Sequence, residues 1–283
     1  MTDSEPKTTA DVPLDLTFSE DELSAHREHI TEFIREAVED AGAKGGVLGL
    51  SGGIDSTLTA YLTVEALGTE GLHGLVLPSE VNEEDNMSDA ERVARELDIE
   101  YDVIEIEPIV DAFLDAFPAE LEPIDSESLK NTVGNVRVRT RAVCNYFVAN
   151  HENRVVLGTG NRSEALVGYF TKYGDGAVDC HPIGNLYKQQ VRQLAREIGV
   201  PDDLVEKTPT AGMWVGQTDE EEMGMGYDVL DAILALHIDG PLSTTATARE
   251  LDIEREDVET VETLVARSEH KREMPPAPDE LSL

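Results

Sequence analysis

The stretch from Gly49 to Ser56, GLSGGIDS, constrains the fold of this chain more than any other. The apolar run from Gly46 to Leu50 predicts a short buried strand, and the residues from Ile54 onward predict a helix. The Ser-Gly-Gly turn therefore leads straight from a strand into a helix N-terminus. The first backbone N–H groups of a helix have no intrahelical partner, and the helix dipole adds partial positive charge there, so this turn suits a bound phosphate group.

The chemistry of the turn differs from that of the common lysine-containing phosphate loop. No G-x-x-x-x-G-K-[ST] pattern occurs, and Asp55 stands just after the glycines. A carboxylate at this place would repel a phosphate unless a divalent cation lay between them, which indicates magnesium bound with a nucleotide. The alternative is an ordinary strand-to-helix turn that uses serine and glycine for backbone reasons only.

Strands alternate with helices along the chain, and this order predicts an α/β fold. We expect a parallel, doubly wound, Rossmann-like sheet with helices on both faces and ligands outside the carboxyl ends of the strands. We expect a single domain over residues 18–272, a flexible acidic tail over 1–17 and a proline-rich tail over 273–283. The predicted strands are 46–50, 71–78, 101–106 and 154–157, and the predicted helices include 19–41, 54–68, 88–97, 109–117, 126–150 and 186–198.

The charge of the chain is strongly negative: 59 acidic residues against 22 basic ones give −37 over 283 residues. The electrostatic field of such a charge opposes binding of nucleic acid or of an anionic membrane surface. Acidic runs such as 83–85 and 219–222 are spread along the chain, which favours a solvated acidic surface. We expect adaptation to a salt-rich cytoplasm, because molar salt shortens the Debye length to about 3 Å. Equal stability at low and molar salt would refute this hypothesis.

Other features narrow the location and class of the protein. The N-terminus lacks the basic start and apolar core of a signal peptide, and no apolar run approaches a membrane span, so we expect a cytoplasmic protein. Cys144 and Cys180 have no metal or redox spacing and are interpreted as small buried hydrophobes. The helical pattern over 243–267 resembles a helix-turn-helix, but its second helix is acidic, so a helical cover is preferred.

Two further segments could contact a ligand. A second strand-to-helix turn follows the fourth strand at 158–164, where Ser163 stands at the third glycine position of a dinucleotide fingerprint. The segment 169–179 is rich in glycine, tyrosine and charged residues and lacks periodicity. It is either a surface connector or a substrate loop.

The turn at 49–56 resembles the pyrophosphate-binding loop, S-G-G-x-D-S, of the ATP pyrophosphatase superfamily. The wider chain is similar to one family in it, the ammonia-dependent NAD synthetases, over about residues 20–272. This resemblance implies that the carboxylate of deamido-NAD attacks the α phosphorus of ATP, that pyrophosphate leaves, and that ammonia displaces AMP to give NAD. The matching segments are GLSGGIDS, GNVRVRTR from Gly134, GTGNRSE from Gly158, GYFTKYGDGAVD from Gly168, Leu186 with Lys188, and PTAGMWVGQTDEEEMG from Pro209.

The resemblance also implies roles for individual residues. Asp55, Asp175 and Lys188 would be catalytic, with Asp175 near ammonia, and Asp55 and Glu164 would hold Mg²⁺. ATP would be bound by Gly49, Ser51, Gly52, Gly53, Ile54, Asp55, Ser56, Thr159, Lys188 and Thr210. Deamido-NAD would be bound by Asn135, Arg139, Lys172, Asp179, His270 and Lys271.

Several alternatives stay open. Glu164 is also typical of a helix N-terminus stabilised by the dipole, and His270 with Lys271 of a helix end with favourable cations. Arg137 and Arg141 are interpreted as structural. Val76 stands where some members have an arginine ahead of Leu-Pro, which puts an adenine contact from that position in doubt.

The chain length leaves no room for an amidase domain, so free ammonia is the expected nitrogen donor, and delivery by a separate glutaminase subunit is the alternative. The resemblance implies a homodimer with the deamido-NAD site at its interface. The competing functions are another enzyme of the superfamily, such as the synthetase part of a GMP synthetase or a tRNA thiolase, and a catalytically silent nucleotide-binding module.

Overall fold

The computed structural model of the chain describes residues 14–80, 84–117, 126–210, 212, 214 and 217–278. Four parallel strands form one sheet in the order β3-β2-β1-β4. The chain moves outward from β1 to β2 and β3, and then returns to place β4 on the other side of β1. The strand order therefore reverses between β1 and β4, which is where ligands bind in folds of this class. The strands are β1 (Gly46–Leu50), β2 (Leu72–Val76), β3 (Glu100–Val103) and β4 (Val155–Leu157).

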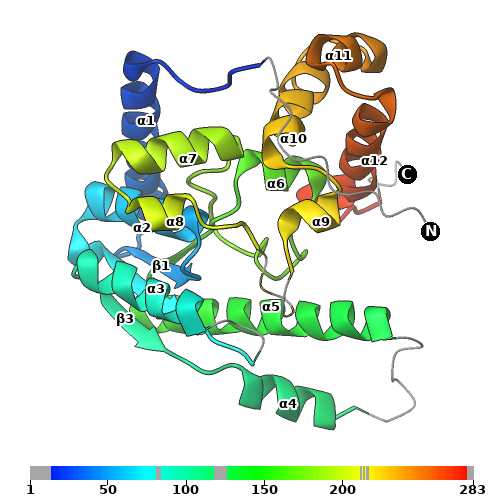
Figure 1. The fold of residues 1–283 in the computed structure, drawn as a ribbon. Coiled ribbons are helices and arrows are strands. Elements are labelled where there is room, and N and C mark those ends of the chain that lie inside the picture. Colours follow the sequence, from blue (N-terminus) through cyan, green and yellow to red (C-terminus); the bar gives the residue numbers. More distant parts are fainter. Residues whose placement is uncertain are drawn as a thin grey trace, which may run out of the picture.

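Helices cover both faces of the sheet, as the sequence predicts. Val47 and Leu75 point to the face that α5 (Ser126–Glu152) covers, and Leu48 and Leu50 point to the opposite face. Alternating side chains of a strand face opposite sides, so β1, β2 and β4 each contribute to both cores. The second face is covered by α1 (Glu20–Asp40), α2 (Ile54–Leu67), α3 (Glu84–Glu96) and α7 (Lys188–Glu197) (Figure 1).

A third apolar cluster lies beside the sheet. Leu230, Ile233, Val258 and Val261 form its buried centre. The helical pair over 243–267 packs into this cluster, so its apolar face is covered, in agreement with the expected helical cover. The elements involved are α6 (Arg162–Val167), α10 (Tyr227–Ile233), a π-helical turn (Leu234–Ile238), α11 (Thr244–Leu251) and α12 (Arg255–Arg272).

The remaining elements are short: a 3₁₀ turn (Thr69–Gly71), α4 (Glu107–Asp115), α8 (Asp202–Val205) and α9 (Asp219–Met223). Ser19 and Glu22 form a capping box at the start of α1. Helix α3 begins four residues before the predicted start at Ser88, and α12 continues to Arg272. Most of the predicted N-terminal tail and the last five residues lie outside the described residues. Within the described ranges, each helix is too short or too polar to cross a lipid bilayer.

Candidate functional site

A cavity of about 280 Å³ opens at the carboxyl ends of β1 and β4, on the line where the strand order reverses. Its walls come from both strand-to-helix turns, from the loop after α6 and from the segment after α8. Most of the residues that the sequence assigns to ATP and to catalysis line it. They are Gly49, Ser51, Gly53, Ile54, Asp55, Ser56, Thr159, Glu164, Asp175, Lys188 and Thr210.

The first turn, between β1 and α2, keeps its helix N-terminus open to a ligand. The N-cap of α2 is Gly53, which has no side chain to accept the first N–H groups of the helix. Ser51 and Ser56 hold the shape of the turn, because Ser51 N donates to Ser56 Oγ at 3.2 Å. Gly52 has a φ of 73°, a conformation that favours glycine. The turn therefore presents backbone donors and two hydroxyls to the cavity.

The second turn, between β4 and α6, closes its helix N-terminus with its own side chains. Asn161 Oδ1 accepts from Glu164 N at 3.0 Å, and Glu164 Oε2 accepts from Asn161 N at 3.3 Å. This is a complete capping box. Glu164 thus uses one oxygen for the cap, and its other oxygen, Oε1, faces the site. Asn161 also donates through Nδ2 to Asp55 Oδ1 at 2.9 Å, which joins the two turns.

Lys188 at the start of α7 is the cation between the two turns. Its Nζ lies 2.5 Å from Asp55 Oδ2 and 3.3 Å from Glu164 Oε1, and the residue is only 1% exposed. Burial opposes a charge on this amine, but the carboxylates of Asp55 and Glu164 outweigh it and raise the pKa of Lys188. A buried ammonium with two carboxylates is well paired, and removing it would leave both acids uncompensated.

A hydrogen-bonded group behind Glu164 extends the acidic side of the site. The hydroxyl of Tyr227 lies 3.3 Å from Glu164 Oε1 and 2.9 Å from Asp219 Oδ2. Burial raises the pKa of Glu164 above its ordinary value, while the charge of Lys188 lowers it. Burial also raises the pKa of Asp219. This part of the site therefore favours a bound cation over a second negative charge.

Asp231 of α10 supports the second turn from behind. It is fully buried, and its carboxylate accepts from the Ser163 hydroxyl and from Gln189 N, the latter at 3.0 Å. The same Ser163 Oγ accepts from Lys188 N at 3.0 Å. One acid thus fixes the N-terminal ends of both α6 and α7, which carry Glu164 and Lys188.

Five of the six residues assigned to deamido-NAD gather around the loop after α6, outside the lining of the cavity. Thr171 Oγ1 donates to Asn135 Oδ1 at 2.8 Å, and Arg139 donates to the Lys172 carbonyl at 3.2 Å. Lys172 Nζ contacts the His270 carbonyl, and Lys271 Nζ donates to the carbonyls of Gly168 and Phe170, each at 2.7 Å. The end of α12 is therefore tied to this loop by Lys271.

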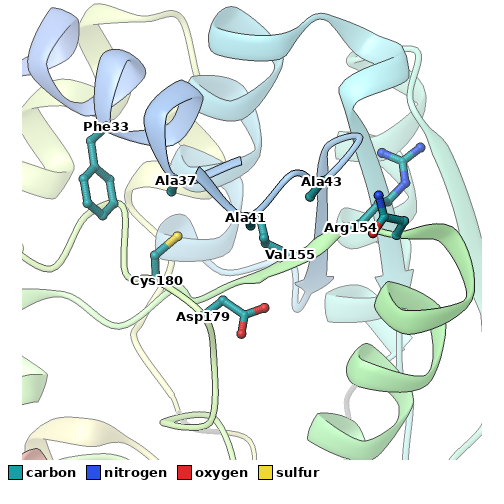
Figure 2. Close-up of a pocket in the computed structure, with 9 residues that line it drawn as sticks. Phe33, Ala37, Ala41, Ala43, Arg154, Val155, Asp179 and Cys180 are labelled. Atoms are coloured by element: carbon teal, nitrogen blue, oxygen red, sulfur yellow. The ribbon is translucent and has the colours of Figure 1, made fainter. Parts of the chain in front are cut away.

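The sixth, Asp179, lies apart from these five. Its Oδ2 accepts from Val156 N at 2.7 Å and its Oδ1 from the Tyr146 hydroxyl at 3.1 Å. Figure 2 shows Asp179 beside Cys180 in a second hollow that is bordered by Phe33 of α1. In this single chain Asp179 caps a free backbone N–H of the edge strand β4 and does not face the cavity.

Comparison with known proteins places the chain in a family. The NAD synthase family model matches residues 26–275. An NH3-dependent NAD+ synthetase of Halobacterium salinarum is 60% identical over 266 residues, which cover 94% of this chain and 97% of the relative. The chain belongs to the NAD synthase family.

Solved structures of the family have the same fold. An NMN synthetase from Francisella tularensis superposes with a TM-score of 0.78 at 34% identity, covering 93% of this chain and 100% of that one. The NH3-dependent NAD synthetase of Campylobacter jejuni, solved with a nitrate ion, gives a TM-score of 0.73 at 29% identity, covering 91% and 99%. The α/β fold predicted from the sequence is confirmed.

The structure places further residues in this candidate site that the sequence did not reveal. Arg141, which we interpreted as structural, lines the cavity and donates to the Leu77 carbonyl at 3.0 Å. Burial and the nearby charge of Arg137 lower the pKa of Arg141 to about 10, so it stays charged at neutral pH. Lys207 and Asp219 also line the cavity.

The position of Asp219 differs from the solvated surface that we expected for its segment. The run 219–222 predicts a solvated acidic surface, but Asp219 is only 4% exposed and lies 3.1 Å and 2.9 Å from the hydroxyls of Tyr169 and Tyr227. Its neighbour Glu222 contacts the Tyr169 hydroxyl at 2.5 Å. Tyrosines from two other segments thus provide the donors that a buried acid needs, and a charge count along the chain does not show them. The two cysteines are free and half-buried, packed against the apolar clusters.

The donor set of the NAD synthase site suits magnesium. Asp55 and Glu164 converge on one lysine, and Mg²⁺ in enzymes is commonly held by one or two carboxylates together with substrate phosphates and waters. Among the described residues, no group of three or more histidine, cysteine or acidic side chains forms a site able to hold a metal ion by itself. A metal here would therefore depend on the phosphates of a bound nucleotide.

Proposed function

We propose that this chain is an ammonia-dependent NAD synthetase that amidates deamido-NAD at the expense of ATP. The observation that carries the proposal is the pair of turns joined by Lys188, Asp55 and Glu164 in a chain of the NAD synthase family. An open helix N-terminus favours phosphates, and two acids beside it favour a metal with those phosphates. The reaction forms a carbon–nitrogen bond and makes the protein a ligase.

In the first step a nicotinate carboxylate oxygen bonds to the α phosphorus of ATP, and the bond from that phosphorus to the bridging oxygen breaks. Pyrophosphate leaves with the electron pair. The N–H groups and hydroxyls of the turn from Ser51 to Ser56 bind this leaving group, together with Thr210. Lys188 keeps its proton and supplies fixed positive charge next to them. These groups favour the transition state because negative charge grows on the pyrophosphate as the bond breaks.

Magnesium belongs to this proposal as a cofactor held by Asp55 and Glu164. When bound, it neutralises phosphate charge and orients the nucleotide. Without it, Asp55 would place a negative charge beside the incoming phosphates. With or without magnesium, Asn161 keeps Asp55 oriented through its hydrogen bond to Oδ1.

In the second step ammonia attacks the acyl carbon of the adenylate and AMP leaves. Asp175 lines the cavity, and its Oδ1 accepts from Thr171 N at 2.7 Å, so its other oxygen can hold ammonium and take up its proton. The loop that carries Asp175 is the one around which Asn135, Arg139 and Lys172 gather. We assign that loop to the deamido-NAD side of the reaction.

We also propose that the active form is a homodimer that works in the cytoplasm. An apolar surface supports the dimer: Phe113 and Phe117 lie on or just after α4 and are 47% and 50% exposed, and Val143 and Phe147 of the adjacent α5 are 69% and 74% exposed. Exposed aromatic side chains at this density are typical of an interface. A dimer would also allow Asp179, which lies outside the cavity of its own chain, to contact deamido-NAD held by a partner.

The function is tested by incubating the protein with ATP, MgCl2, deamido-NAD and ammonium at molar salt and measuring AMP and NAD. We expect both products in equal amounts. No AMP would refute the enzyme, and AMP without NAD would refute the substrate. Nicotinate mononucleotide in place of deamido-NAD is the matched alternative, because one structural relative is an NMN synthetase. Faster amidation of the mononucleotide would assign the chain to that reaction.

A further inference from the structure

The pyrophosphate turn contains no lysine, so positive charge must reach it from elsewhere in the fold. Three cationic side chains among the described residues line the cavity: Arg141, Lys188 and Lys207. They differ in the protein groups that they contact. This difference indicates which of them a phosphate can reach.

Two of the three cations are held in place by several protein contacts each. Lys188 is enclosed by the carboxylates of Asp55 and Glu164. Arg141 contacts the Leu77 carbonyl and the Ser79 hydroxyl beyond the end of β2, at 3.0 and 3.1 Å. Their charges hold the carboxylates and the strand end in place.

Lys207 is placed differently. It follows α8 and lies three residues before Thr210, and the whole segment 207–210 lines the cavity. Its Nζ is 3.4 Å from the carbonyl of Gly52, in the middle of the glycine turn. The side chain is 25% exposed, so the amine can contact a ligand without losing its shielding from bulk water.

The partner of Lys207 stands outside the turn. Asp89 of α3 contacts Lys207 Nζ at 2.5 Å through Oδ2, and its Oδ1 lies 3.6 Å from Arg92. Arg92 in turn pairs with Asp203 at 2.8 Å. Arg92 also lies 3.5 Å from Glu96, so it has two carboxylate partners besides Asp89. A doubly or triply charged phosphate group beside Gly52 would compete with Asp89 for the ammonium group of Lys207.

We propose that Lys207 is a further catalytic residue, which binds the departing pyrophosphate of ATP, and that Asp89 is the positioning residue that aims it at the turn. This inference rests on the proposed function and names the cation that the glycine turn itself lacks. Lys207 stays protonated throughout. It acts by charge on the oxygens that become more negative when the bond from the α phosphorus to the bridging oxygen breaks.

The main test compares K207M with wild type and with K44M. Lys44 is an exposed lysine before β1, at the opposite end of that strand, so K44M removes the same charge from the acidic protein away from the cavity. We expect K207M to lower kcat for AMP formation about 10²-fold, with a change of about threefold or less in KM for ATP. K44M should match wild type, and K207R should restore part of the rate.

A binding measurement keeps the inference separate from the proposed function. Titration calorimetry with inorganic pyrophosphate and MgCl2 requires no turnover, and K207M should bind pyrophosphate about tenfold more weakly than K44M. D89N should lower kcat by a smaller factor than K207M and leave the unfolding temperature of the protein close to that of wild type. If wild type makes no AMP, the proposed function fails and the titration alone decides the role of Lys207. Equal pyrophosphate affinity in K207M and K44M would overturn the inference. A lower rate in K207M together with a lower unfolding temperature and an unchanged pyrophosphate affinity would also overturn it.

Discussion

The two strand-to-helix turns of this NAD synthase look alike in sequence but use their helix N-termini in opposite ways. The turn after β1 is capped by Gly53 and leaves the first N–H groups of α2 to a ligand. The turn after β4 is capped by Asn161 and Glu164, which satisfy each other. An uncapped turn can bind an anion, whereas a self-capped turn can hold an acid in a fixed orientation. The residue at the N-cap, glycine or asparagine, therefore distinguishes a turn that binds an anion from a turn that orients an acid.

The strongest test of this difference is E164Q. The amide oxygen of Gln can still accept from Asn161 N, so the capping box is kept while the charge is lost. We expect AMP formation to fall by on the order of 10²- to 10³-fold and the Mg²⁺ requirement to rise, and the unfolding temperature should also fall because the amide NH2 then faces the buried ammonium of Lys188. Activity and magnesium dependence should be measured together with thermal unfolding. A variant that loses stability and keeps its rate would show that Glu164 is a cap only.

A second test concerns Asp231, which supports the self-capped turn through Ser163. Burial raises the pKa of Asp231 to about 6, above its ordinary value of 3.8. The folded state therefore binds this proton more tightly than the unfolded state. The resulting stability is fully present below about pH 4 and is lost as the pH rises through 6.

D231N removes this titration. The free energy of unfolding of wild type relative to D231N should fall by about 3 kcal/mol between about pH 4 and pH 7. Denaturant unfolding of both proteins, at the same high salt concentration throughout, measures this difference in free energy. A difference that stays constant over this range would contradict the assigned pKa.

The smallest expected effect separates the two turns most directly. An added Cβ at Gly53 would lie 3.3 Å from Ser51 Oγ, and one at Gly160 would lie 3.3 Å from His181 Nδ1. The two substitutions to alanine are thus sterically matched. G53A should weaken ATP binding about tenfold, because its methyl group occupies space where phosphate meets the backbone, and G160A should leave it unchanged. Equal losses in both variants would mean that both turns contact the nucleotide.

The sequence predicted the first turn well because its signals are local. An apolar run, two glycines and a helical pattern lie within about a dozen residues, and β1 and α2 form there. The alternation of strands and helices likewise predicted the parallel sheet, because each element carries its own hydrophobic period. The uncertain points were boundaries such as the start of α3.

The site was less predictable because its contacts join distant segments. Lys188 meets Asp55 across 133 residues and Glu164 across 24, and only the family resemblance brought them together. Lys207 and Asp219 belong to no local pattern that distinguishes them from surface charges. Their proximity to Gly52 and to Tyr227 exists only after folding. The roles of Asp179 and of the other deamido-NAD residues stay predictions.

The hydrogen bonds at the C-terminal end of α12 imply an order in which parts of the site form during translation. Lys271 holds the carbonyls of Gly168 and Phe170, 103 and 101 residues earlier, and Arg272 holds those of Ala165 and Leu166. The glycine turn can form early in translation, but the loop that carries Asp175 is fastened only when the last helix has left the ribosome. The residues assigned to ATP end at Thr210, so they emerge before the bonds that hold the amidating loop, and a stop codon shortly before Lys271 would keep those residues and remove the bonds.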